Sequence, residues 1–220
     1  MRKPYRKAAL ICLLILPCLT ACGSLLDSGK PDNLFRFGVP DAEKLQGVAG
    51  TGARTLALAR IRFAPEIEGD RIMTAHGDTV LYVKDARWAA PAPDLYTQAL
   101  LRQYRSRAPD LYLAPPRERP GQRTGSVLRL EIDRFEARYG GQAGKGSAPI
   151  VLVSGVATLT NPARVEEIVS QRFSAQEPAT ANGKAAIVEA FDRAVARQTG
   201  DLVDWSLKAV AEFENPEGGQ

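Results

Sequence analysis

The thiol of Cys22 is the side chain whose neighbours most clearly specify a chemistry. It closes the tetrad Leu19-Thr20-Ala21-Cys22, which has the pattern of a lipobox, the cleavage and lipidation site of bacterial lipoprotein signal peptides. Small residues at positions 20 and 21 suit a protease that must close over the backbone, and the thiol is the nucleophile that accepts diacylglycerol. The sequence therefore predicts that residues 1–21 are removed and that Cys22 becomes an acylated first residue.

The residues before the tetrad support this prediction. A positive n-region that stays on the cytoplasmic side is formed by Arg2, Lys3, Arg6 and Lys7. Ala8 to Cys18 is an apolar h-region, too short for a transmembrane helix, which needs about 20 apolar residues. The alternatives are an ordinary signal peptide or an N-terminal membrane anchor, but a plain cut needs no cysteine at its boundary.

Lipidation of Cys22 would fix the mature chain to a membrane. Two or three acyl chains, at about 0.8 kcal/mol per buried methylene, hold a protein firmly where one chain does not. The expected covalent groups are a diacylglycerol and an N-acyl chain such as palmitate, and no other cofactor is expected. By resemblance to enterobacterial lipoproteins, Gly23 and Ser24 lack the aspartate that retains a lipoprotein at the inner membrane. This predicts an outer-membrane location facing the periplasm.

The remaining reactive side chains do not assemble into a catalytic motif. His76 is the one histidine of the chain, it falls in a predicted turn, and no G-x-S-x-G elbow accompanies it. One histidine and no thiol left free by lipidation cannot supply a zinc site of the usual ligand types. In the stretch 140–147, Lys145 is followed by Gly146 rather than Ser or Thr, so the phosphate-loop spacing fails. The sequence predicts no catalytic residue, no metal site and no enzyme.

The charge balance gives no support to a nucleic-acid partner. The chain has 29 Lys and Arg against 25 Asp and Glu, but four of the positive residues precede Cys22, which leaves 25 against 25 after cleavage. The two cysteines before Cys22 lie in the signal segment, so the mature chain is expected to have no disulfide. Its stability must then come from a hydrophobic core, and a chain of this length predicts one ordinary domain.

Alternating apolar residues predict strands along most of the mature chain. The expected strands are 35–39, 55–63, 71–74, 79–83, 111–113, 128–139, 149–160 and 165–175, with the last a weaker edge strand. Within 128–139 the apolar phase slips by one residue near Asp133-Arg134, which predicts a β-bulge or a sharp bend.

Two segments show helical spacing instead. One begins near Pro93, which suits a first helical turn, and carries apolar residues at Leu95, Ala99, Leu100 and Tyr104. The other runs over 183–213 with an apolar stripe broken by a polar position at Gln198. Strands, helix, strands and helix with hairpin-length connections predict an α+β fold: a single domain with a mainly antiparallel sheet and two principal helices packed on it.

Domain boundaries follow from composition. Residues 22–34 are small, polar and interrupted by Gly and Pro, so they are expected to form a lipidated, flexible tether. The folded domain is expected over 35–214, and a disordered tail over 215–220.

The chain resembles the ABC-type transport auxiliary lipoproteins. The matching run is Gly69-Asp70-Arg71-Ile72-Met73-Thr74, Val80-Leu81-Tyr82-Val83 and Ala86-Arg87-Trp88-Ala89-Ala90-Pro91, followed by a helix with Leu95 and Leu100. The resemblance implies an accessory subunit of an intermembrane phospholipid transport system, whose partner is an MCE-domain protein of an ABC transporter complex. It also implies membrane attachment and possible contact with phospholipid, with the ATP chemistry in other subunits.

The partner contact is expected at an exposed sheet edge or at the step formed by Arg87, Trp88 and Pro91. A tryptophan at that junction is more often a core plug than a binding contact. Two other functions stay open: a lipoprotein for lipopolysaccharide assembly, and a periplasmic hydrolase or glycan-binding lipoprotein, which the missing catalytic residues disfavour.

Overall fold

The computed structural model describes residues 32–39, 54–116, 125–140, 146–161 and 164–214. Cys22, the signal segment, most of the tether and the tail at 215–220 lie outside these residues. From Asp32 onward the chain forms one compact unit. Its elements are β1 (Asn33–Phe35), β2 (Arg54–Leu58), β3 (Arg62–Phe63), β4 (Arg71–His76), β5 (Thr79–Trp88), α2 (Ala92–Arg107), β6 (Leu111–Ala114), β7 (Val127–Tyr139), β8 (Ile150–Asn161), β9 (Arg164–Pro178) and α3 (Lys184–Glu214).

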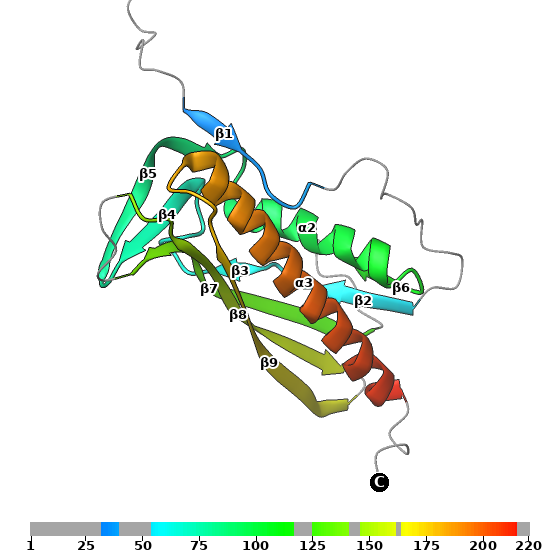
Figure 1. Ribbon diagram of the computed structural model, residues 1–220. Helices are drawn as coiled ribbons and strands as arrows, with labels where there is room; N and C mark the ends of the chain where they lie inside the picture. Colours follow the sequence, from blue (N-terminus) through cyan, green and yellow to red (C-terminus); the bar gives the residue numbers. More distant parts are fainter. Residues whose placement is uncertain (1–31, 40–53, 117–124, 141–145, 162–163, 215–220) are drawn as a thin grey trace, which may run out of the picture. The chain divides into compact units, whose positions relative to one another are not determined.

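β7 is the strand around which the sheet is organised (Figure 1). Along one side it pairs antiparallel with β8, which in turn pairs antiparallel with β9. Along its other side it pairs in succession with β2, β3 and β4, each in a short parallel register. β5 extends the sheet beyond β4, and β1 and β6 add short parallel pairings to β5 and β2.

The predicted fold class is confirmed. The long pairings of β7, β8 and β9 and the β4–β5 hairpin are all antiparallel, so most paired residues are antiparallel. In the described part of the chain two helices, α2 and α3, accompany the sheet. The short parallel pairings were not expected. The predicted strand 55–63 is divided into β2 and β3, because between their pairings this chain advances four residues while β7 advances three. The predicted strand at 35–39 lies earlier, over Asn33–Phe35.

The predicted slip in β7 is confirmed as a register shift between Ile132 and Arg134. Gly155 of β8 lies opposite Ile132, and a Cβ atom there would lie 2.4 Å from the carbonyl oxygen of Glu131. No side chain fits in that space, so glycine allows the two backbones to approach where the ladder is irregular.

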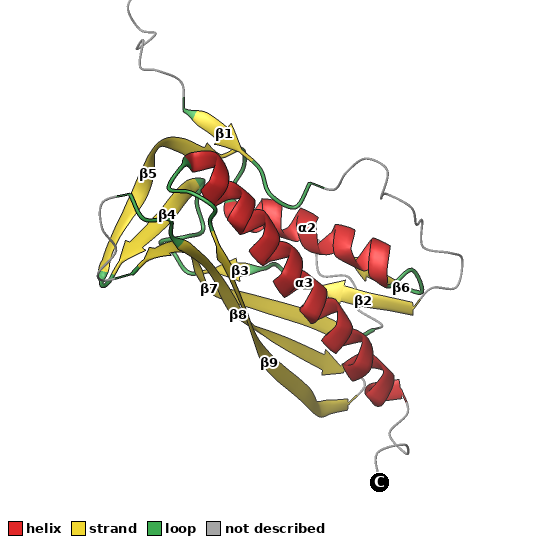
Figure 2. Ribbon diagram, viewed as in Figure 1, coloured by secondary structure: helices red, strands yellow, loops and turns green. Residues whose placement is uncertain are grey.

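Both helices pack on the same face of the sheet, here called the inner face (Figure 2). The core between the sheet and the helices contains an aromatic cluster of Phe37, Trp88, Phe135 and Phe191. The polar position predicted in the second helix is also buried. Gln198 accepts a hydrogen bond from the Tyr96 hydroxyl at 2.8 Å and donates to the carbonyl oxygen of Phe173 at 3.2 Å, so the bonded amide links α2, α3 and β9.

Candidate functional site

Trp88, one of the three residues proposed for partner contact, is a core residue. It ends β5 with 2% of its surface exposed. Its ring meets Phe37 and Phe191 edge to face, with centroids 5.0 and 5.2 Å away. Such pairs favour the packed state beyond the area they bury. In the folded chain the indole offers a partner almost no surface, because α3 and the segment after β1 cover it, as expected for a core plug.

Arg87 is half exposed and holds neighbouring segments together. Its Nε donates to Asp32 at 2.5 Å and one terminal nitrogen donates to Asp70 at 3.0 Å. The hydrogen bond to Asp32, followed by the charge of Asp70, raises the pKa of the Arg87 guanidinium above its ordinary value. Arg87 therefore fixes the start of β1 and the turn before β4 against the end of β5.

Pro91 is exposed and precedes the first residue of α2. The corner that it forms is bonded through the backbone, since the amide of Ala92 donates to the carbonyl of Gly69 at 3.0 Å. The three residues of the predicted step thus belong to one structural corner, in which Arg87 and Pro91 reach the surface and Trp88 does not.

His76 ends β4 and stacks on Tyr139, with ring centroids 4.3 Å apart and planes 6° from parallel. Burial raises the pKa of the Tyr139 phenol, which donates to Asn182 at 2.6 Å. Within the described ranges no group of three or more His, Cys, Asp or Glu side chains could hold a metal ion. The surroundings of His76 thus form an aromatic surface rather than a nucleophile–base pair.

The β4–β5 hairpin presents an unpaired strand edge. Gly77, at φ 59°, supplies the positive φ that the first position of a two-residue II′ turn requires. β1 pairs with Ala86–Trp88, and among the described residues no strand pairs with the outer side of β5 from Thr79 to Asp85. We call this segment the hairpin edge. It carries Val80 and Leu81, whose surfaces are 50% and 54% exposed.

A bulge ends the hairpin edge at Asp85. Between two successive pairings β4 advances two residues while β5 advances five, and Asp85 has φ 50°, a conformation that L residues rarely adopt. The Asp85 carbonyl accepts hydrogen bonds from Asn33 at 3.1 Å and from Lys184 at 3.0 Å. These two bonds hold the bulge against β1 and α3.

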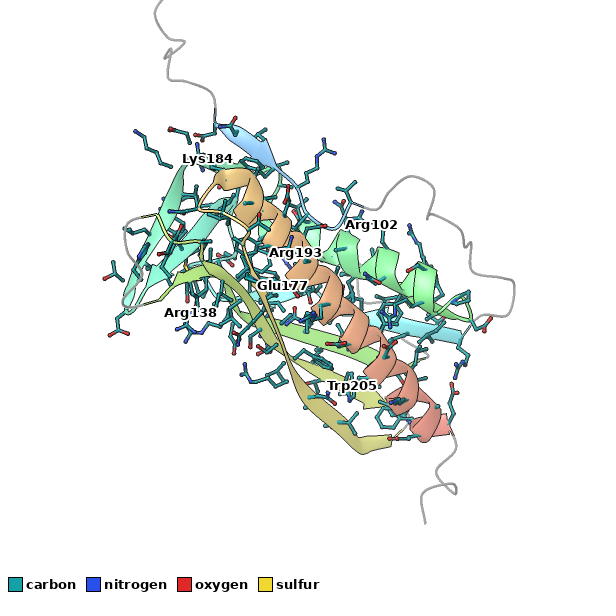
Figure 3. The ribbon with its side chains drawn as sticks, in the orientation of Figure 1. Arg102, Arg138, Glu177, Lys184, Arg193 and Trp205 are labelled. Carbon is teal, nitrogen blue, oxygen red and sulfur yellow. The ribbon has the colours of Figure 1, made fainter. Side chains whose placement is uncertain are left out.

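An open pocket of about 540 Å³ lies beside the hairpin, and we call it the hairpin pocket. Its walls come from β4 and β5, the end of β7, and the start of α3, where Lys184 is seen close to β1 and β5 (Figure 3). Leu81 and Thr74 face each other across the hairpin, and Thr74 is paired with Ala137 of the core, so the pocket opens on the inner face. This is the part of the inner face that lies beyond the first turn of α3.

Sequence reasoning missed the pocket, although one signal pointed to it. The run Val80-Leu81-Tyr82-Val83 is apolar in both phases of a strand, which is unusual for a hairpin with one solvated face. Because the structure leaves both Val80 and Leu81 half exposed, the run is an apolar surface on both sides of the hairpin rather than a buried strand.

The hairpin edge and the hairpin pocket thus share exposed apolar side chains of β5. No helix in the described part of the chain is long and apolar enough to cross a bilayer.

Comparison with known proteins identifies a matching family model and similar solved structures. The family model for the ABC-type transport auxiliary lipoprotein component matches residues 39–203. The crystal structure of a Xanthomonas campestris protein of family model DUF330 is similar, with 22% identity, 83% of this chain and 99% of that chain covered, and a TM-score of 0.66. A second crystal structure, of an uncharacterized protein, has 14% identity, covers 80% of this chain and 99% of that chain, and has a TM-score of 0.61. These two structures show the fold alone. No curated protein matches the sequence.

Proposed function

The chain belongs to the family of ABC-type transport auxiliary lipoprotein components, and from this premise we propose that it is a periplasm-facing lipoprotein that docks an MCE-domain protein in intermembrane phospholipid transport. The observation that carries the proposal is the family match over the folded domain. The predicted acylation of Cys22 supplies the membrane attachment. Neither a nucleotide site nor a catalytic set is required of such a subunit.

The length of the tether limits where the domain can work. The first residue of the folded unit, Asp32, follows Cys22 by ten positions. Ten residues reach at most about 36 Å when fully extended. An acylated Cys22 would therefore keep β1 and the adjoining end of β5 close to the bilayer. Outer-membrane sorting, as Gly23 and Ser24 predict, would direct the domain into the periplasm.

The hairpin edge is the surface that we assign to the MCE-domain protein. An unpaired strand edge can accept an extended segment, whose main-chain hydrogen bonds supply affinity while side-chain contacts supply specificity. His76 and Thr79 flank the two-residue turn and bond to each other through their backbones. Because N–H groups alternate in direction along a strand, those of Val80 and Tyr82 point away from β4. These donors and the exposed apolar side chains lie on one short segment.

In-cell photo-crosslinking tests this assignment. A photoreactive phenylalanine analogue placed at Val80 of the full-length lipoprotein should capture an MCE-domain protein. The same analogue at the exposed Gln171 of β9, on the opposite edge of the sheet, should not. Capture of a large outer-membrane β-barrel instead, or of the same partner from both positions, would overturn the assignment.

A matched pair of substitutions tests the contribution of the strand edge. Proline is tolerated on an edge strand where the lost N–H faces solvent, so Val80→Pro removes an outward donor without breaking the β4 pairing. Val80→Thr keeps both the donor and the β-branched shape. We expect Val80→Pro to reduce co-purification of the MCE-domain protein about tenfold and Val80→Thr to change it less than threefold, the difference of one main-chain hydrogen bond. Equal loss in both variants would rule out strand addition.

A further inference from the structure

The hairpin pocket has both apolar and polar walls, and its apolar wall is continuous between β5 and α3. Leu81 and Val83 of β5 and Ile187 of α3 line it together with the stacked rings of His76 and Tyr139. Its volume of about 540 Å³ lies within the range of roughly 300–1,000 Å³ found for small-molecule sites. The half exposure of Leu81 shows that this wall is open to a ligand from outside. The shape and lining suit a hydrocarbon chain.

One end of the pocket is cationic. Lys184 is the first residue of α3, a helix of 31 residues whose first turn contains no acidic side chain. A helix N-terminus favours negative charge, so a lysine there reinforces the positive end of the dipole instead of balancing it. Toward the described residues the Lys184 ammonium donates one hydrogen bond, to the Asp85 carbonyl, and an ammonium has three donors. None of the described residues that line the pocket is acidic.

We propose that the hairpin pocket binds one acyl chain of an anionic phospholipid, with the headgroup phosphate at Lys184 and the start of α3. An open pocket with an apolar wall and a cationic helix terminus at one end matches an amphiphile with one hydrocarbon tail and one anionic group. This rests on the proposed function, which brings the domain to a membrane surface. A free fatty acid has the same two features, so the experiment must separate the phosphate from a carboxylate.

Photolabelling of the purified full-length lipoprotein in detergent micelles tests the proposal. The probes are phosphatidylglycerol, phosphatidylethanolamine and palmitate, each with a diazirine in the acyl chain. We expect phosphatidylglycerol to label the peptides that carry Leu81 and Ile187 several-fold more than either other probe. Stronger labelling by palmitate would overturn the phospholipid assignment, and labelling spread evenly over the surface would overturn the pocket.

Two adjacent positions provide a matched control. Leu81 lines the pocket, whereas Val80 is equally exposed and points to the opposite face of the same strand. Leu81→Asp should reduce labelling by phosphatidylglycerol about tenfold, and Val80→Asp should leave it within twofold. Lys184→Gln should abolish the preference for phosphatidylglycerol over phosphatidylethanolamine while labelling of the pocket persists. Equal effects of the two aspartate variants, at unchanged thermal stability, would refute the proposal.

These measurements need no partner protein, so they can fail independently of docking. Loss of the crosslink to an MCE-domain protein with intact labelling would overturn the docking assignment alone. Intact docking with no labelling of the pocket would overturn the lipid site alone.

Discussion

Replacing Trp88 with alanine should destabilise the domain severely and should affect partner binding only through folding. Burial of the indole is nearly complete, and large aromatic-to-alanine changes in cores cost about 3–5 kcal/mol. Two edge-to-face contacts, with Phe37 and Phe191, are each worth about 0.5–1.5 kcal/mol beyond area burial and place this site toward the upper end of that range. We therefore expect a loss of about 4–5 kcal/mol, a large part of the roughly 5–15 kcal/mol that stabilises a typical domain.

Urea unfolding followed by far-ultraviolet circular dichroism measures this loss. Trp88→Phe keeps an aromatic ring in the cluster and should cost about 1–2 kcal/mol. Trp205, near the far end of α3 (Figure 3), is partly exposed and contacts Phe173, so Trp205→Ala is the matched control and should cost less than Trp88→Ala. All three variants remove or shrink an aromatic ring, so the prediction is their order: Trp88→Ala should lose more free energy of unfolding than either Trp88→Phe or Trp205→Ala.

A different outcome would show that the reasoning is wrong. If Trp88→Ala cost less than about 1 kcal/mol, the ring would not be part of a tightly packed core. If, in addition, this folded variant no longer co-purified with the MCE-domain protein, Trp88 would be a binding contact.

Four further predictions follow from other residues. Burial raises the pKa of both Tyr96 and Tyr104, so the native state keeps their protons after the unfolded state loses them. Above pH 10 these two groups should lower the free energy of unfolding, measured by urea titration, by about 1.4 kcal/mol per pH unit for each tyrosine, and a flat profile from pH 10 to 11.5 would contradict this. Glu136→Met should raise the free energy of unfolding by about 1 kcal/mol in urea titrations, because the carboxylate is 1% exposed, has no hydrogen-bond partner among the described residues, and lies 3.5–3.8 Å from two arginines that are more than half exposed. A net loss would show that the ion pairs outweigh desolvation. Gly155→Ala should cost about 3 kcal/mol or more by the same measurement, since the added carbon overlaps the β7 backbone, whereas a neutral result would mean that the two strands can separate without loss. Cys22→Ser should abolish incorporation of labelled palmitate and move the protein out of the membrane fraction, and unchanged membrane association would contradict lipidation at this residue.

Local patterns predicted much of the fold. The one-residue slip in β7, the start of α2 near Pro93 and the buried polar position at Gln198 each depend on a few neighbouring residues whose periodicity is visible in the sequence. Turn residues between 74 and 79 also located the β4–β5 hairpin. These features could be predicted because strand alternation, helix spacing and turn chemistry act over short distances.

The parallel pairings could not be predicted in the same way. Leu34 lies beside Arg87 and Thr55 beside Tyr112, yet no local pattern encodes which distant strand a short segment joins. The role of Trp88 was similarly open, because a tryptophan after an arginine at the end of a strand suits both a core and a contact. Its burial is decided by Phe191, about one hundred residues later, through the placement of α3.

The bulge at Asp85 connects the two surfaces that we assign to ligands. Its carbonyl is held by Asn33 of β1, which continues the tether, and by Lys184, which lies at the cationic end of the hairpin pocket. A phosphate at Lys184 would compete with this carbonyl for the ammonium, and the remaining bond from Asn33 is exposed and therefore weak. Lipid binding would then loosen the bulge that ends the hairpin edge and change the length of edge open to a partner strand. A ligand can shift that equilibrium only by its difference in affinity for the two arrangements. Lys184→Gln removes the ammonium for which phosphate and carbonyl would compete, so it should abolish any effect of phosphatidylglycerol on crosslinking from Val80.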